Sequence, residues 1–212
     1  MEANFWHQKW ERGEIAFHQS EANPFLVAHV QQLQLPQASR VFLPLCGKTL
    51  DFAWLLTNGY QVVGAELSAI AIKELFDDLG LTPTITTAGK MHHYHAENID
   101  IFVGDIFDLS AEMLGTVNAI YDRAALVALP ADLRKQYTAH LLDISNTAAQ
   151  LLITFIYDQT QMDGPPFSIN EAEVNHHYAA SYQIERLENK ALEGGLKGVA
   201  TIENVWLLQK TH

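Results

Sequence analysis

The sequence has few cysteines and few basic residues, and each shortage removes a class of protein. Cys46 is the one cysteine, so the chain cannot close a disulfide within itself and suits a reducing compartment. Lys and Arg number 13 against 25 Asp and Glu, which gives a formal net charge of −12 at pH 7. This charge repels nucleic-acid phosphates and anionic membranes, so we expect neither as a partner. A small molecule is the natural partner that remains.

Several sequence signals are also missing. No apolar run approaches the roughly 20 residues that cross a bilayer. The first residues lack the basic-then-apolar pattern of a secretory signal, so the sequence predicts a cytoplasmic protein. No Gly-x-Ser-x-Gly motif supports a serine hydrolase. Without repeats or linkers, 212 residues that are 48% hydrophobic predict a single α/β domain over 1–212, small enough to favour a monomer.

What the sequence does contain is a β-α-β unit between residues 40 and 68. An apolar run (41–45) ends at a turn with Gly47, a helix-forming segment follows, and a second apolar run (62–65) ends at Glu66. Glu66 comes 19 positions after Gly47, near the roughly 20-residue spacing at which an acid meets ribose hydroxyls. The turn has one glycine where dinucleotide sites have three. The unit therefore predicts a nucleoside site of open identity, with an incidental acid at a strand end as the alternative.

The rest of the chain predicts more strands and a changed pattern near the end. Apolar runs indicate strands over 100–104, 117–121 and 150–157, with helices between them. A small hairpin is expected around Gly89. The stretches 182–187 and 201–208 alternate, which is typical of an antiparallel pair. Parallel β-α alternation followed by such a pair favours a methyltransferase-type sheet over a pure dinucleotide fold.

In a doubly wound sheet, ligands bind beyond the carboxyl ends of the strands, and several polar residues fall there. Glu66 can accept two hydrogen bonds from a ribose diol, and Asp105 can accept one from an adenine amine. Arg123 can pair with an amino-acid carboxylate. Leu45 and Ile106 can contact a purine or a methionine chain. This set suits S-adenosylmethionine better than a dinucleotide, whose pyrophosphate needs bare amides and a glycine-rich loop.

Simpler interpretations of these residues stay open. Asp105 is also placed to cap a following helix, and Arg123 to form an ion pair with Asp122 or Glu66. Cys46 is better explained as a small buried residue beneath a ligand than as a nucleophile.

Three histidines, His92, His93 and His95, suggest a metal cluster at first sight. His93 and His95 would share one face of a strand, but no third ligand is evident from the sequence. The sequence therefore favours a solvated hairpin here, and no metal is expected.

Residues 1–22 are unusually rich in aromatic side chains for a chain end. They include Phe5, Trp6, Trp10 and Phe17, whereas disordered tails are poor in aromatics. Trp6 and Trp10 are four apart, which places both on one face of a helical turn. The segment either caps the core or forms a lid over the nucleoside site.

Taken together, these stretches resemble the thiopurine S-methyltransferase family in its compact bacterial form. The similarity runs in order through GEIAFH (13–18), VFLPLCGKTLD (41–51), GAELS (64–68), YDRAAL (121–126) and MDGPPFS (162–168). The resemblance implies a class I, Rossmann-like fold: a doubly wound, mostly parallel seven-stranded sheet with an antiparallel last strand and an N-terminal aromatic lid. It also implies S-adenosyl-L-methionine as cofactor and S-adenosyl-L-homocysteine as product.

The resemblance further implies two sets of site residues. The cofactor positions would be Trp10, Leu45, Glu66, Arg123, Phe17, Gly47, Asp105 and Ile106. The acceptor pocket would be walled by Phe17, Pro166 and Phe167. Arg123 would also be catalytic, by steadying a thiolate or relaying a proton. Some family members carry an arginine in the loop before the last strand, and residues 193–198 hold none, which counts against thiopurine acceptance and a two-arginine mechanism.

The activity that the resemblance implies is methyl transfer to the sulfur of an aromatic or heterocyclic thiol such as a thiopurine, giving a thioether. Such a thiol ionises near neutrality, so alignment of donor and acceptor matters more than a strong base. Relatives methylate halide, thiocyanate, selenium or tellurium species, which is the first alternative. A non-catalytic nucleoside-binding module and a nicotinamide dehydrogenase are the others, and the single glycine of the first turn counts against the dehydrogenase.

Overall fold

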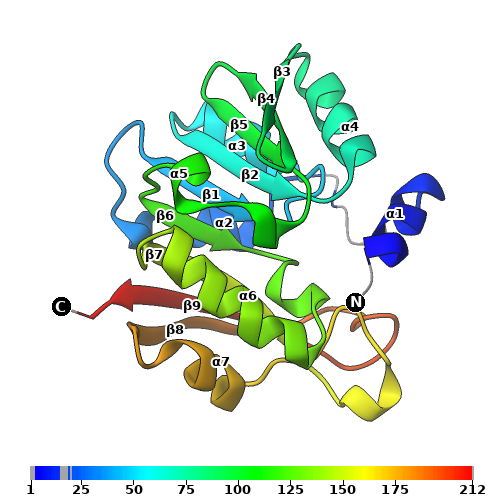
Figure 1. Cartoon of the computed structure of the whole chain (residues 1–212). Helices are drawn as coiled ribbons and strands as arrows, with labels where there is room; N and C mark the ends of the chain where they lie inside the picture. Colours follow the sequence, from blue (N-terminus) through cyan, green and yellow to red (C-terminus); the bar gives the residue numbers. More distant parts are fainter. Residues whose placement is uncertain (1–2, 15–18, 20, 212) are drawn as a thin grey trace.

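A nine-stranded sheet forms the centre of the computed structural model, which describes residues 3–14, 19 and 21–211 (Figure 1). The strand order is β3-β4-β5-β2-β1-β6-β7-β9-β8. The five parallel strands are β1 (Arg40–Pro44), β2 (Gln61–Glu66), β5 (Ile99–Val103), β6 (Ala119–Asp122) and β7 (Ala149–Ile156). The strands whose pairing is antiparallel only are β3 (Thr84–Ala88), β4 (Met91–Ala96), β8 (Tyr182–Ala191) and β9 (Ile202–Lys210).

The predicted fold class is confirmed, and the predicted number of strands is corrected. The order β5-β2-β1-β6-β7-β9-β8 is the expected doubly wound sheet, with the last strand β9 antiparallel to both of its neighbours. A total of seven strands is wrong because the hairpin β3–β4 does not stand apart from the sheet. Strand β4 pairs with β5 from His92 opposite Val103 to Ala96 opposite Ile99, which adds two strands at that edge.

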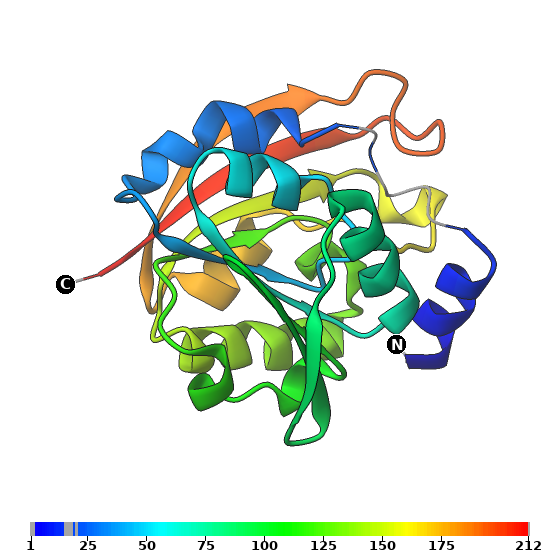
Figure 2. The ribbon, with the colours of Figure 1, turned by 90° about the horizontal axis from the view of Figure 1, so that it is seen from above.

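Helices cover both faces of the sheet, as Figure 2 shows. One face carries α2 (Pro24–His29), the 3₁₀ turn η1 (Val30–Leu33), α3 (Asp51–Thr57) and α4 (Ala69–Leu79). The other carries α5 (Ala111–Leu114), the 3₁₀ turn η3 (Leu126–Ala128), α6 (Ala131–Ile144) and α7 (Glu171–Tyr178). Successive residues of β1 alternate between the two cores: Val41 and Leu43 face the first layer and Phe42 the second. This two-sided burial explains why the parallel strands are continuous apolar runs.

Local signals set where the helices around the sheet begin and end. The Asn23 side chain accepts a hydrogen bond from the amide of Phe25 and caps α2, with Pro24 as the first helical residue. Ser68 caps α4 by accepting from the amide of Ala71, and Gly80 ends that helix with φ +66°. Since Ser68 lies just beyond β2, the same short segment ends a strand and starts a helix at the edge where the parallel strands end.

Helix α1 (Ala3–Glu11) belongs to neither layer and lies beyond one end of the sheet, near α4 (Figures 1 and 2). Within the described part of the chain, no helix combines the length and the apolar content needed to cross a membrane.

Candidate functional site

A cleft of about 1430 Å³ opens where the parallel strands end. Four strand ends contribute to its lining: residues 43–49 at and beyond the end of β1, Glu66 and Leu67 at the end of β2, 104–107 after β5, and Arg123 and Ala124 after β6. The predicted cofactor residues found in this lining are Trp10, Leu45, Gly47, Glu66, Asp105, Ile106 and Arg123. Phe17 lies outside the described residues.

Glu66 joins two of these strand ends. Its side chain is 6% exposed; Oε2 accepts a hydrogen bond from the amide of Gly47 at 2.8 Å, and Oε1 accepts one from the amide of Ser68 at 2.9 Å. Burial raises the pKa of the Glu66 carboxyl, and hydrogen bonds from backbone amides, Ser68 first and Gly47 next, offset part of that rise. Each carboxylate oxygen has a further lone pair for a ligand hydroxyl. Gly47 and Glu66, which are 19 positions apart in the sequence, are thus joined by a hydrogen bond from the Gly47 amide to the Glu66 carboxylate.

The backbone is strained at three residues of the lining. Leu45, directly after β1, has φ +46°, and Ala124, two residues after β6, has φ +61°. Lys197, between β8 and β9, has φ +51°. This left-handed conformation is less favourable by roughly 1–2 kcal/mol of free energy for a residue that has a Cβ atom. Such strain is concentrated at ligand sites, where the surrounding structure enforces it.

Asp122 and Arg123 are adjacent in the sequence, but Asp122 lies in the core and Arg123 lines the cleft. Arg123 is half-buried and lines the cleft. Asp122 is fully buried, and its carboxylate accepts hydrogen bonds from the amide of Leu126 at 3.0 Å and the hydroxyl of Tyr137 at 2.7 Å. Asp122 thereby fixes the start of η3 against α6, while its neighbour faces the ligand space.

The burial of Asp122 predicts a pH dependence of stability. Burial raises its pKa to about 6, despite the hydrogen bonds from Leu126 and Tyr137. The folded protein therefore holds a proton on Asp122 at pH values where the unfolded chain has lost it, so the free energy of unfolding falls as pH rises from about 4 to about 6. In Asp122→Asn, the free energy of unfolding should therefore fall by about 3 kcal/mol less over this pH range than in the parent protein. Urea unfolding at pH 4 and pH 7 measures it.

The control for this experiment is Asp78→Asn, because Asp78 is exposed on α4. That variant should keep the pH dependence of the parent protein. An equal fall in the free energy of unfolding in Asp122→Asn and the parent would contradict the assignment to Asp122.

Asp105 is exposed at the end of β5 and also lines the cleft. Its Oδ1 accepts a hydrogen bond from the amide of Phe107 at 3.0 Å and caps the 3₁₀ turn η2 (Ile106–Asp108). The helix-cap role that the sequence left open is therefore present, and it coexists with a position at the ligand space.

Helix α1 closes one side of the cleft with aromatic rings. Phe5, Trp6 and Trp10 all line it, and Trp10 is 6% exposed, whereas residues 4–9 and 11 of the same helix are half-buried or exposed. Lys9 lines the cleft as well and pairs with Glu14 at 2.5 Å.

Another part of the lining is a proline loop that follows β7. Pro165 and Pro166 line the cleft, and the hydroxyl of Tyr157 donates to the carbonyl of Pro166 at 2.6 Å. Phe167 is not among the described lining residues. Its amide donates to the carbonyl of Val127 at 2.6 Å, and its ring lies 5.6 Å from the Arg134 guanidinium. Phe167, predicted to wall the acceptor pocket, therefore packs behind the proline loop and against Arg134.

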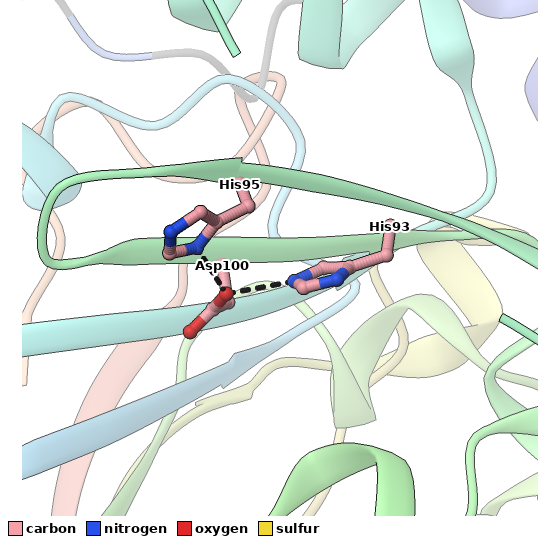
Figure 3. A group of neighbouring side chains, drawn as sticks. All are labelled: His93, His95 and Asp100. Atoms are coloured by element: carbon pink, nitrogen blue, oxygen red, sulfur yellow. Dashed lines mark hydrogen bonds and ion pairs between the residues drawn. The ribbon is translucent and has the colours of Figure 1, made fainter. Parts of the chain in front are cut away.

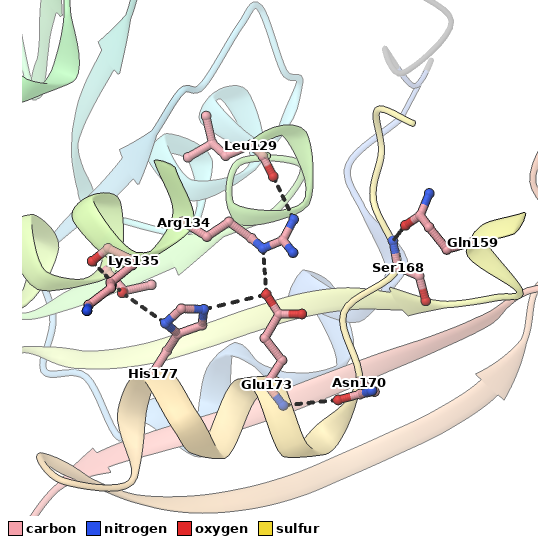
Figure 4. Close-up of polar contacts among 9 residues, drawn as sticks. Leu129, Arg134, Lys135, Gln159, Ser168, Asn170, Glu173 and His177 are labelled. Carbon is pink, nitrogen blue, oxygen red and sulfur yellow. Dashed lines mark hydrogen bonds and ion pairs between the residues drawn. The ribbon is translucent and has the colours of Figure 1, made fainter. Parts of the chain in front are cut away.

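Arg134 is a buried cation that the sequence did not point to. Figure 4 shows its side chain between Leu129 and Glu173 of α7. It is 7% exposed; Nη1 donates to the carbonyl of Leu129 at 2.7 Å, and Nε donates to Oε1 of Glu173 at 2.6 Å. His177 Nε2 lies 3.5 Å from the same Glu173 oxygen. Because Leu129 lines the cleft, Arg134 anchors part of the cleft wall to α7.

The lining also includes residues that no motif pointed to, notably Gln136, Phe155, Leu192, Leu196, Lys197 and Glu203. Phe155 and Glu203 meet because β7 and β9 pair at those positions. Burial raises the pKa of the Glu203 carboxyl, and the charges of Arg123 and Lys190 offset part of that rise. Only the pairing of strands distant in sequence brings these two side chains together, so no local pattern could predict them.

Comparison with known proteins gives a match over nearly the whole chain. The profile of the thiopurine S-methyltransferase family covers residues 1–210. The thiopurine S-methyltransferase of Teredinibacter turnerae is 51% identical over 211 residues, which is 99% of this chain and 98% of that protein. That of Gluconobacter oxydans is 49% identical over 205 residues, or 96% of this chain and 93% of that protein.

Solved structures share the fold at low sequence identity. The 1,6-didemethyltoxoflavin-N1-methyltransferase of Burkholderia thailandensis, with bound 1,6-didemethyltoxoflavin and S-adenosylhomocysteine, has a TM-score of 0.68 at 15% identity, covering 99% of this chain and 87% of that one. An S-adenosylmethionine-dependent methyltransferase from Anabaena variabilis has a TM-score of 0.65 at 13% identity, covering 99% and 95%. These similarities identify the sheet as that of class I methyltransferases.

Proposed function

The chain belongs to the thiopurine S-methyltransferase family of S-adenosylmethionine-dependent enzymes, and from this premise we propose that it methylates the sulfur of an aromatic or heterocyclic thiol. The products would be S-adenosylhomocysteine and a thioether. The observation that carries the proposal is the cleft itself, in which a buried carboxylate, a guanidinium and apolar walls face one ligand space.

The strand ends in the first half of the chain suit the adenosyl group. Glu66 is held by two backbone amides and keeps lone pairs for the ribose hydroxyls. Leu45 and Ile106 offer apolar contact to the purine, and the exposed carboxylate of Asp105 can accept from its amine. The residues present therefore fit the cofactor of the family.

The sulfonium and the amino-acid part suit the neighbouring residues. Arg123 would bind the cofactor carboxylate by charge-assisted hydrogen bonds. The rings of Trp6 and Trp10 offer π faces to a positive charge. When bound, S-adenosylmethionine supplies an electrophilic methyl group, and the task of these residues is to orient it and exclude water.

The acceptor would lie between the proline loop and the last third of the chain. Pro166, Leu129 and Phe155 form apolar walls that suit a flat ring. The thiol proton passes to water before transfer, because aromatic thiols ionise near neutrality. Arg123 would steady the thiolate by its charge, which makes it the residue proposed for catalysis.

A transfer assay with labelled cofactor tests this function. The protein is incubated with methyl-labelled S-adenosylmethionine and, in separate arms, thiophenol, a thiopurine, iodide, thiocyanate, selenite and tellurite. We expect label on the sulfur of thiophenol or the thiopurine. Label only on an inorganic acceptor would favour the first alternative, and cofactor binding without transfer to any acceptor would indicate a non-catalytic module.

Arg134 gives a prediction about the acceptor wall. In Arg134→Met, the Leu129 carbonyl and the Glu173 carboxylate lose their buried donor, so the wall containing Leu129 should loosen. We expect the KM for the thiol to rise about tenfold, about 1.4 kcal/mol, with little change in the dissociation constant of the cofactor. Steady-state kinetics and calorimetry measure the two quantities.

The matched control is Arg186→Met, which removes an exposed arginine that pairs with Glu171 of the same helix α7 at 3.0 Å. It should leave both constants unchanged, and Arg134→Lys should recover part of the KM. Equal losses in cofactor and acceptor binding would mean that Arg134 maintains the fold in general rather than the acceptor wall.

A further inference from the structure

A second group of converging side chains lies on the edge hairpin, outside the lining of the cleft. Figure 3 shows His93 and His95 of β4 pointing to the carboxylate of Asp100 in β5. His93 Nε2 lies 2.7 Å and His95 Nδ1 lies 2.8 Å from the same oxygen, Oδ1. The sequence offered two histidines without a third ligand, and the fold supplies Asp100 as the third.

Strand register brings these three residues together. His95 is directly opposite Asp100, and His93 is opposite Phe102, in the antiparallel pair β4–β5. Because side chains alternate along a strand, His93 and His95 share one face with Asp100, while His92 lies on the other. The arrangement therefore depends on the two extra strands that extend the sheet beyond the predicted seven.

The three side chains are held in place by their surroundings. The His93 ring stacks on Phe102 with centroids 4.6 Å apart and planes 10° apart. Arg40 Nη2 donates to Oδ2 of Asp100 at 3.0 Å, which fixes the carboxylate and leaves Oδ1 to the histidines. His93 and Asp100 are half-buried and His95 is exposed, so water can reach the group.

Two imidazoles and one carboxylate are a donor set that transition metals prefer. The three ligand atoms lie within 4.8 Å of one another. Zn²⁺, Ni²⁺ and Cu²⁺ bind imidazole nitrogen and carboxylate oxygen at about 2.0–2.2 Å, with water completing an open site. A neutral histidine moves its proton to the other ring nitrogen to present a lone pair, so binding needs no oxidant or reductant.

We propose that His93, His95 and Asp100 bind one divalent transition-metal ion of the Zn²⁺, Ni²⁺ or Cu²⁺ class, at a site separate from the methyl-transfer cleft. Arg40 acts as the outer partner that orients the carboxylate. The ion links β4 to β5 and so fastens the edge hairpin to the sheet. A metal that binds only the folded chain also raises its stability by mass action.

Isothermal titration of the full-length chain with ZnCl₂ or NiCl₂, in a non-chelating buffer at pH 7.5, tests the site. We expect one ion per chain, at least tenfold weaker binding in His93→Gln and in His95→Gln, and unchanged binding in His92→Gln. The histidine at 92 is the matched control because it is exposed on the same strand but faces the other way. Mg²⁺ should not compete, since it prefers oxygen ligands.

A thermal melt supplies the second readout. Zn²⁺ should raise the Tm of the parent and of His92→Gln, and leave that of His95→Gln unchanged. Because His95 is 58% exposed, its replacement should leave the fold intact. Absence of zinc binding by the parent, or equal binding by the parent and both ligand variants, would overturn the proposal and leave a hydrogen-bonded cluster. Neither result bears on methyl transfer, because no residue of this group lines the cleft.

Discussion

Replacing Glu66 with alanine is expected to weaken binding of S-adenosylmethionine by about 1.5–3 kcal/mol, the range for hydrogen bonds to a charged group. This corresponds to a dissociation constant roughly 10- to 150-fold higher. The physical cause is twofold: the ribose hydroxyls lose their acceptor, and the amides of Gly47 and Ser68 lose the carboxylate that aligns them. Calorimetric titration with the cofactor measures the change.

A conservative variant and a control variant complete this test. Glu66→Gln keeps the shape of the side chain but turns an amide nitrogen toward one of the two backbone donors, so it should lose less affinity than alanine. Glu97→Ala removes an exposed carboxylate from the turn after β4 and should bind the cofactor like the parent protein. Unchanged affinity in Glu66→Ala would remove this residue from the site.

Deletion of residues 1–19 is expected to abolish methyl transfer while the rest of the chain stays folded. The two hydrophobic cores contain no described residue of α1, so their packing does not depend on that helix. The cleft does depend on it, because Phe5, Trp6 and Trp10 form one of its sides. Without them water enters, and small misplacements of reacting groups already cost about 100-fold in rate.

The transfer assay and circular dichroism measure the two halves of this expectation. Trp10→Ala should give an intermediate loss of transfer, because Trp10 is the most buried of the three rings. Arg12→Ala, an exposed change in the same segment, should be neutral. Full activity in the truncated protein would refute the lid and leave the aromatic rings as a cap on the surface.

The sequence predicted those parts of the fold that follow from local pattern. Strands buried on both faces are apolar throughout, so the run ending at Glu66 could be recognised together with the acid at its end. The number of strands could not, because the pairing of β4 with β5 joins a polar, histidine-rich segment to an apolar one. Nothing in the composition of β4 distinguishes a free hairpin from a sheet edge.

The residues of the candidate site also include some that the sequence predicts and some that it does not. Residues at strand ends, such as Glu66 and Arg123, were predictable because parallel strands end at one edge. Phe167 shows the limit, since it follows Pro166 directly and yet packs against Arg134 rather than lining the cleft. Glu203 shows a second limit. It reaches the cleft because β9 pairs with β7 so that Glu203 lies opposite Phe155, and this register cannot be read from the sequence of β9 alone.

The cleft draws its two halves from different portions of the polypeptide. Apart from the aromatic side given by α1, one portion of the lining comes from residues 43–107, with Glu66 and Asp105. The other comes from residues 121–203 and includes Arg123 and, in the connection between β8 and β9, Leu192, Leu196 and Lys197. In the proposed function, the first portion binds most of the cofactor and the second contacts the acceptor. Under that proposal, grafting residues 192–201 from a relative is expected to change the choice of nucleophile while the strand ends that hold the nucleoside stay as they are.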